Sequence, residues 1–159
     1  MTGVRIMLLY LMRHGEAGKE GDDAARGLTE KGFKEVSLAA VYARDRHIKM
    51  NAIYHSGKRR AMQTAQIFSD HLKPENGVSE TDGLAPLDEP EMWAGRIAGI
   101  RENIMLIGHL PYLSRLSGLL LCGDKENMFV DFKTGGIACL QRYHDGHWML
   151  AWMIMPDMI

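Results

Sequence analysis

Hydrophobic and polar positions along the chain predict strands and helices that alternate. Short apolar runs bounded by polar residues are typical of buried strands, and apolar residues that recur every three or four positions are typical of amphipathic helices. The expected strands are 6–12, 52–55, 103–109 and a shorter one at 78–80, and the expected helices are 30–45, 59–72, one near 90–101 and one beginning at Pro111.

The first two helices have recognisable buried faces. Thr29 is a suitable N-cap for the helix over 30–45, and the polar, glycine-containing stretch 18–27 before it is expected to be a loop. Helical spacing assigns to the buried side of this helix Phe33, Val36, Ala40 and Val41. The corresponding residues of the helix over 59–72 are Ala61, Ala65, Ile67, Phe68 and Leu72.

The last part of the chain has a different pattern. Two strand-like segments, 136–143 and 147–154, flank Asp145-Gly146, a dipeptide typical of hairpin turns. Strand–helix units followed by a hairpin predict an α/β fold: a three-layer α/β/α sandwich whose mixed, mainly parallel sheet ends in a C-terminal antiparallel hairpin. Since no repeat or change in composition divides the sequence, we expect a single domain over residues 1–159.

Composition narrows the class of protein. The content of 46% hydrophobic and 25% charged residues is ordinary for a soluble globular protein, and a net charge of -1 argues against binding nucleic acid through a broad cationic surface. No apolar run is long enough to cross a membrane, and no signal peptide is evident, so a cytoplasmic location is expected. Cys122 and Cys139 lack metal-site spacing and are expected to be small buried side chains.

Polar residues that could carry chemistry follow three of the predicted strands. Arg13-His14-Gly15-Glu16 follows the first strand, Lys58-Arg59-Arg60 the second, and His109 the strand that ends at Gly108. If these strands are parallel neighbours, their carboxyl ends meet in one crevice. Two arginines could neutralise a phosphate dianion there, and they would lower the pKa of a neighbouring histidine, leaving it neutral and able to attack phosphorus.

Two of these groups allow a simpler interpretation. Lys58-Arg59-Arg60 begins a helix, where the helix dipole disfavours cations, and a bound phosphate would remove that penalty. A solvated basic turn is the alternative. A single histidine such as His109 is more often structural than catalytic, but Pro111 starts a helix whose free N–H groups would face the same pocket.

These motifs resemble the histidine phosphatase superfamily. Arg13-His14-Gly15 matches its signature triplet, Ser56 with Arg60-Ala61-Met62-Gln63-Thr64 matches its second motif, and Gly108-His109-Leu110-Pro111 matches its third. Arg26-Gly27-Leu28-Thr29 with Gly32 resembles an element of the compact SixA-like phosphohistidine phosphatases, and 132–138 fits that branch. Each motif alone is a weak signal, but four in order are a strong one.

The resemblance implies a phosphoglycerate mutase-like fold and a two-step reaction without a metal or other cofactor. His14 would accept the phosphoryl group and water would then remove it. Arg13, Arg60 and His109 would hold the phosphoryl oxygens, with Arg26 as a further phosphate contact. His144 and His147 could pass for a metal-binding pair, but they lie across the hairpin turn with no third ligand near in sequence.

The general acid is less defined. Larger relatives use a carboxylate, for which Asp88 and Glu89 are the candidates by position, although acidic residues also favour the start of a helix. Glu16 is another possibility, or else a structural residue. A phosphohistidine substrate would lessen the need for an acid, because its imidazole can already be protonated near neutral pH.

Three functions follow in order of preference. The first is a phosphatase acting on phosphohistidine in a protein, such as a phosphorelay or phosphotransfer component, because the interval 61–108 leaves little room for a lid. The second is a phosphatase of a small phosphate ester, and the third a non-catalytic phosphate-binding module. The sequence leaves open the oligomeric state, and whether His55 or Ser56 reaches the pocket.

Overall fold

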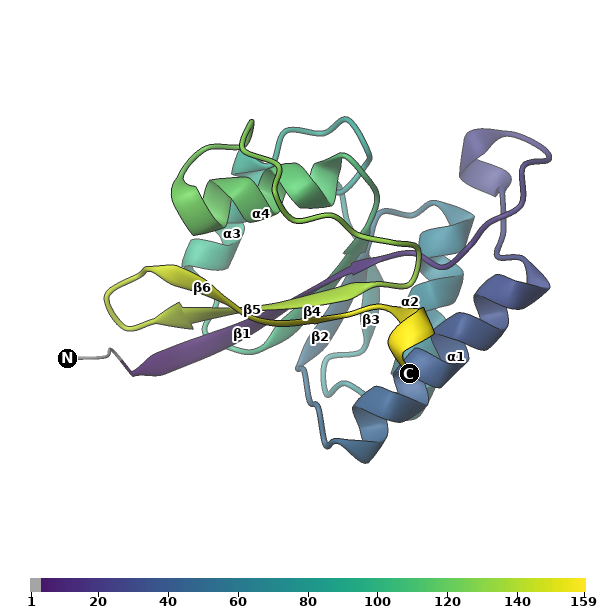
Figure 1. Cartoon of the computed structure of the whole chain (residues 1–159), viewed down its shortest axis with the longest axis horizontal. Coiled ribbons are helices and arrows are strands. Elements are labelled where there is room, and N and C mark those ends of the chain that lie inside the picture. The colour runs from purple at the N-terminus through teal and green to yellow at the C-terminus, as the bar shows by residue number, and fades with distance from the viewer. Residues whose placement is uncertain (1–3) are drawn as a thin grey trace.

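A six-stranded mixed sheet forms the centre of the structure, a computed structural model that describes residues 4–159 (Figure 1). The strands are β1 (Arg5–Arg13), β2 (Ala52–His55), β3 (Val78–Glu80), β4 (Ile104–Gly108), β5 (Ile137–Tyr143) and β6 (Trp148–Ile154). They lie in the order β3-β2-β4-β1-β5-β6. The first four are parallel, whereas β5 is antiparallel to both β1 and β6. This is the expected parallel sheet closed by a hairpin.

Helices cover both faces of the sheet, which confirms the three-layer prediction (Figure 1). The helices are α1 (Glu30–Asp45), α2 (Arg59–Leu72), α3 (Glu91–Ala98) and α4 (Tyr112–Cys122), with two 3-10 turns, η1 (Asp23–Ala25) and η2 (Pro156–Met158). Helices α1 and α2 pack on one face, and α3 and α4 on the other. None of the helices within residues 4–159 is long and apolar enough to cross a membrane.

The position of β1 between two helical layers explains why its sequence is an unbroken apolar run. Leu9 and Leu11 contact the α3–α4 layer, whereas Tyr10 and Met12 contact the α1–α2 layer, and all four are almost fully buried. A central strand of a covered sheet is buried on both faces, so its residues need not alternate in polarity. Burial of such side chains contributes about 1.5–3 kcal/mol each.

Helix α1 begins as predicted, but its buried face is rotated. Thr29 caps the helix by accepting a hydrogen bond from the Gly32 N–H, as expected. Phe33, predicted to be buried, is 41% exposed. The reason lies one residue earlier: a side chain at Gly32 would meet the Glu16 carbonyl oxygen at 2.2 Å. Close packing of Gly32 against that backbone fixes the rotation of the helix and turns Phe33 outward.

Two other expectations need correction. The helix predicted near 90–101 ends at Ala98, because the N–H groups of Gly99 and Ile100 already close its last turn on the carbonyls of Arg96 and Ile97. Cys122 is exposed in the last turn of α4, where its thiol contacts the Gly118 carbonyl, whereas Cys139 is buried in β5 as expected. Neither change alters the sheet.

The sheet topology brings three strand ends together. Arg13 is in register with Gly108, and His55 with Ile107, so β1, β4 and β2 end at the same level. The segment before β5 closes over this edge: the Gly135 N–H contacts the carbonyls of Arg13 and His14, and the Arg13 N–H donates to Gly136. The predicted convergence of the three motifs is therefore present.

Candidate active site

His14 is held rigidly at the end of β1. Its backbone N–H donates to the Gly108 carbonyl, and its ring Nδ1 lies 2.7 Å from the Gly15 carbonyl oxygen. Because a carbonyl can only accept, Nδ1 carries the proton and the neutral ring has its lone pair on Nε2. Glycine at position 15 lets this segment pack closely on α1, since a side chain there would approach Val36 to 2.6 Å.

The surroundings of His14 keep it neutral. The ring is buried, and burial is the main reason that its pKa falls from 6.5 to about 4. Arg60, Arg13 and Arg26 lower the pKa further, while the Gly15 carbonyl opposes them. The Arg60 Nε–H donates a hydrogen bond to the His14 Nε2 at 3.3 Å, so the lone pair faces a cation and is unprotonated at neutral pH.

Arg60 is the buried member of the basic turn at the start of α2. Its Nη1 donates to the Asp23 carbonyl oxygen at 2.6 Å, and its Nη2 donates to the Asp23 carboxylate at 3.1 Å. Lys58 also contacts that carboxylate, whereas Arg59 is exposed. The solvated-turn interpretation thus fits Arg59 alone, and Lys58 and Arg60 both contact an anion.

His109 lies beside His14, with ring centroids 4.9 Å apart. Its Nε2 is 2.6 Å from the Ser56 hydroxyl, and its buried Nδ1 has no hydrogen-bond partner within residues 4–159. Burial, followed by the charges of His14 and Arg60, lowers the pKa of His109 to about 3. Ser56 therefore reaches the site through His109, whereas His55 accepts a hydrogen bond from the Gly57 N–H.

Arg13 completes the group from the last position of β1. Its Nη1 donates to the Phe132 carbonyl oxygen at 2.8 Å, which anchors the guanidinium to the segment before β5. Its buried Nε has no partner among the described residues, and burial lowers its pKa. An arginine with an unused donor beside two neutral histidines is suited to bind an anion.

These side chains line one cavity of about 450 Å³, called here the cationic cavity. Its lining consists of Arg13, His14, Glu16, Ala17, Lys19, Asp23, Arg26, Arg60, Pro86, His109, Leu110 and Thr134. All four residues that sequence analysis placed at the centre, and Arg26 with them, are in this list. The cavity can hold a phosphoryl group between a neutral nucleophile and several cations.

The two carboxylates proposed as general acids lie outside this lining. The Asp88 carboxylate accepts a hydrogen bond from the Ala85 N–H at 2.9 Å. Glu89 is exposed and pairs with Lys125 and Arg115, and these contacts lower its pKa. The structure therefore does not bring Asp88 or Glu89 together with His14.

Two other carboxylates line the cavity. Glu16 accepts a hydrogen bond from the Thr29 hydroxyl at 2.8 Å. Asp23 contacts Arg26, Arg60 and Lys58, and hydrogen bonds from Lys58 and Arg26 hold its pKa far below the usual range. Sequence analysis missed Asp23 because it lies in a polar loop without periodicity; its position three residues before Arg26 was the only available signal.

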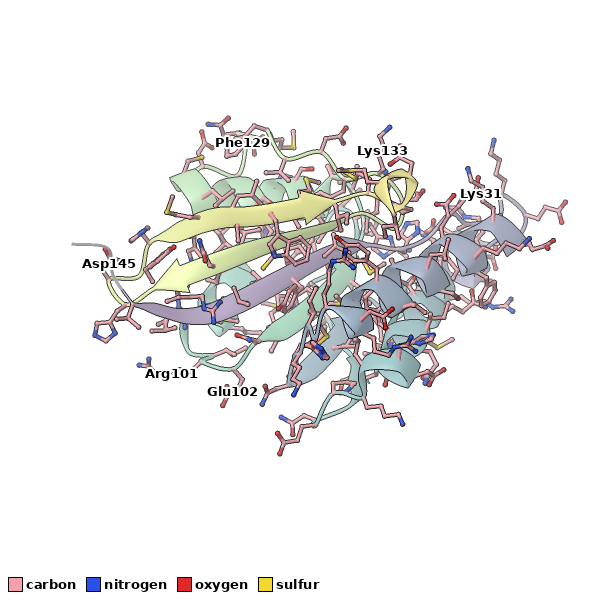
Figure 2. The ribbon with its side chains drawn as sticks, turned by 60° about the horizontal axis from the view of Figure 1, so that its bottom comes forward. Lys31, Arg101, Glu102, Phe129, Lys133 and Asp145 are labelled. Carbon is pink, nitrogen blue, oxygen red and sulfur yellow. The ribbon has the colours of Figure 1, made fainter. Side chains whose placement is uncertain are left out.

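The histidines of the hairpin are remote from the cavity. His147 stacks on Tyr143 and pairs with Asp145. Figure 2 shows Asp145 at the left end of the molecule, well apart from Lys133, which precedes the cavity residue Thr134. Within residues 4–159, no three His, Cys, Asp or Glu side chains are grouped as a metal site would require.

Comparisons with known proteins agree with this geometry. The family model described as the histidine phosphatase superfamily (branch 1) matches residues 9–105. A structure of the protein histidine phosphatase SixA complexed with tungstate superimposes with a TM-score of 0.85 at 24% identity, covering 95% of this chain and 98% of that one.

Two further structures have the same fold. One is assigned as a phosphohistidine phosphatase SixA from Agrobacterium tumefaciens (TM-score 0.77, 26% identity, 94% and 97% covered). The other is a phosphoserine phosphatase mutant from Entamoeba histolytica with phosphoserine (TM-score 0.73, 17% identity, 96% and 98% covered). No curated protein matches by sequence. Phosphatases with different substrates thus share this architecture.

Proposed function

The chain belongs to the histidine phosphatase superfamily, and on that basis we propose that it hydrolyses phosphohistidine on a protein through a phosphoryl group carried by His14. In the first step the His14 Nε2 lone pair forms a bond to phosphorus while the bond from phosphorus to the substrate imidazole breaks. In the second, water attacks phosphorus, the bond to Nε2 breaks, and orthophosphate leaves. One domain carries both steps, in the cytoplasm.

The hydrogen-bond donors of the cavity have a direct role in these steps. Charge spreads over the phosphoryl oxygens in the transition state, and donors fixed in advance stabilise it without reorganising. We assign this role to Arg13, Arg60 and His109, with Arg26 as a further contact. The positive field of the three arginines takes the part that a metal ion has in other phosphatases, so we expect the rate to be unchanged by a chelator.

Whether a carboxylate can protonate the leaving group distinguishes phosphohistidine from alkyl phosphates as a substrate. An alkoxide leaving group needs a proton, but Asp23 and Glu89 are each held ionised by cations. Asp88 is bonded to a loop N–H and Glu16 to Thr29. His109 is neutral as well, given a pKa of about 3. A protonated phosphohistidine brings its own proton and leaves as neutral imidazole, so its cleavage does not depend on any of these groups acting as an acid.

The connections around the cavity support a protein substrate. The interval between α2 and α4 holds only β3, α3, β4 and short connections, and Leu87 in one of these is 82% exposed. The connection between β3 and α3 contributes Pro86 alone to the lining of the cationic cavity. A side chain projecting from another protein could therefore reach His14.

A small phosphate ester is the second candidate. A volume of about 450 Å³ is within the range of small-molecule sites, and one structural relative is a phosphoserine phosphatase. A non-catalytic phosphate-binding module is a weaker third candidate, since the neutral His14 ring keeps a lone pair on Nε2 and has cations around it.

Steady-state kinetics distinguish these functions. We expect kcat/KM for a phosphohistidine-bearing protein and for phosphoramidate to exceed that for phosphoserine and other alkyl phosphates by about 100-fold or more, the scale of one missing acid. A preference for an alkyl ester by a similar factor would favour the second candidate. Absence of turnover on every substrate, with phosphate binding unchanged in His14→Ala, would favour the third.

A further inference from the structure

The loop that carries Asp23 is closed at its base. Ala17 and Leu28 form an isolated antiparallel bridge, and the Gly18 N–H donates to the Gly27 carbonyl oxygen at 2.9 Å. Beyond this base, residues 19–25 form a short excursion, called here the Asp23 loop. Two backbone contacts therefore define where such a loop would hinge.

The tip of the Asp23 loop buries little surface against the rest of the protein. All residues from 19 to 25 are exposed, and η1 buries none of its side chains. In Figure 1 this segment, in purple, stands away from the sheet beyond the start of α2. Since burial of apolar side chains is the main force that holds a loop in place, polar contacts must position this tip.

Among residues 4–159, the side-chain contacts that join the tip to the rest of the protein all involve Asp23. Its carboxylate accepts hydrogen bonds from Arg26 Nη2 at 2.7 Å and from Arg60 Nη2 at 3.1 Å, and it pairs with the Lys58 ammonium. Its backbone carbonyl oxygen accepts a hydrogen bond from Arg60 Nη1 at 2.6 Å. Both terminal nitrogens of Arg60 are thus bound to one residue. These are the donors that a phosphoryl group would use, because bidentate contacts of this kind are typical of arginine with phosphate.

We propose that Asp23 is an internal anion that occupies the phosphoryl-binding cations in the free enzyme and is displaced by the phosphoryl group of the substrate. The inference rests on the proposed function and names a specificity-determining residue of the same site. A dianion can replace the single charge of a carboxylate, whereas a singly charged ligand gains little. When orthophosphate leaves, Asp23 returns to Arg60 and opposes rebinding.

The contacts favour displacement at a moderate cost. The Asp23 side chain is 53% exposed, and ion pairs between exposed groups are individually weak. Removing the carboxylate should therefore tighten phosphate binding by about 3- to 30-fold, the range that a few such contacts give together. Because Asp23 stays ionised, the competition should persist throughout the neutral pH range.

Calorimetric titration with orthophosphate and with tungstate tests the proposal in the whole chain. Asp23→Asn keeps the size of the side chain and removes its charge. Asp22→Asn is the matched control, because Asp22 is the exposed neighbour and its side chain makes no capping contact. We expect Kd to fall by about 3- to 30-fold in Asp23→Asn and to change less than about 2-fold in Asp22→Asn.

Two outcomes of the titration would overturn the proposal. Weaker or unchanged binding in Asp23→Asn would mean that Asp23 is a fixed positioning residue for Arg60, and the proposal would fail. Equal tightening in both variants would mean a general charge effect and would also overturn it. Asp23→Ser, which lacks both the charge and the amide, should tighten binding as Asp23→Asn does if the carboxylate is the competitor.

Binding without turnover separates this inference from the proposed function. If the chain fails to hydrolyse phosphohistidine but Asp23→Asn still tightens orthophosphate binding, only the choice of substrate is wrong. If phosphohistidine is hydrolysed and the Asp23 effect is missing, only the internal anion is wrong. If no variant binds orthophosphate or tungstate, both are contradicted.

Discussion

Two buried arginines at opposite ends of the sheet have different partners. Arg60, 4% exposed, lies at the carboxyl end of the parallel strands and contacts His14 and the exposed Asp23 loop. Arg142, 5% exposed, lies near the start of β1, in register with Met7. It donates to the carbonyls of Ile97 and Ile100 at 2.6 and 2.5 Å, where α3 ends.

The partners decide what each arginine can do. Backbone carbonyls at a helix C-terminus are fixed, and the helix dipole favours a cation there, so Arg142 serves to hold α3 against the sheet. The contacts of Arg60 are to a histidine and to a carboxylate on a weakly held loop, and these can be exchanged for a ligand. A buried charge is therefore not evidence of function by itself. A buried arginine whose hydrogen-bond partners can be replaced by a ligand is better evidence of a binding site.

The same substitution at both positions should separate activity from stability. Arg60→Met should lower kcat/KM by about 10³-fold, because it removes a fixed donor to the transition-state charge. Its free energy of unfolding should stay within about 1 kcal/mol of the wild type, since a cation next to Arg13, Arg26 and Lys58 is lost. Kinetics and denaturant unfolding of the same preparation measure both quantities.

The paired variant should do the reverse. Arg142→Met leaves the two α3 carbonyls without their donor, and we expect a loss of about 3 kcal/mol in the free energy of unfolding. Below the unfolding transition, kcat/KM per folded molecule should remain within about 2-fold of the wild type, since Arg142 is remote from the cationic cavity. Loss of activity in folded Arg142→Met, or of stability in Arg60→Met, would break the distinction between the two arginines.

The smallest expected effect is on the titration of His14. Its pKa of about 4 lies below 6.5, so the ring is neutral above this pKa and loses its lone pair as the pH falls through it. Arg60→Met removes one of the charges that lower the pKa, and should raise it while burial still holds it below 6.5. Arg142→Met should leave it unchanged. Nitrogen chemical shifts of His14 measured against pH report the difference; equal pKa values in all three proteins would show that Arg60 exerts no field on His14.

Sequence patterns predicted the fold well where burial determines them. The apolar run of β1, the cap at Thr29 and the Asp145-Gly146 turn are local signals, and each led to the observed element. The outward rotation of Phe33 was not predictable from local spacing, because it depends on contact between Gly32 and the distant Glu16 backbone.

The site was predictable to a similar extent. Motifs at the ends of three strands placed Arg13, His14, Arg60 and His109 in one cavity, because parallel strands of a sheet end at a common edge. Asp23 was missed, since nothing in a polar loop indicates which of its carboxylates will contact a distant helix. Asp88 and Glu89 were suggested by position along the chain, which does not determine where a side chain points.

Trapping the phosphoryl group tests the central claim about His14 most directly. The enzyme is mixed with phosphoramidate that carries labelled phosphorus, and the reaction is stopped within milliseconds in alkaline denaturant, in which phosphohistidine is preserved. We expect one label on the peptide that contains His14, formed and lost at rates compatible with turnover, and no label in His14→Ala. Label on another residue, label that persists in His14→Ala, or full turnover by that variant would contradict it.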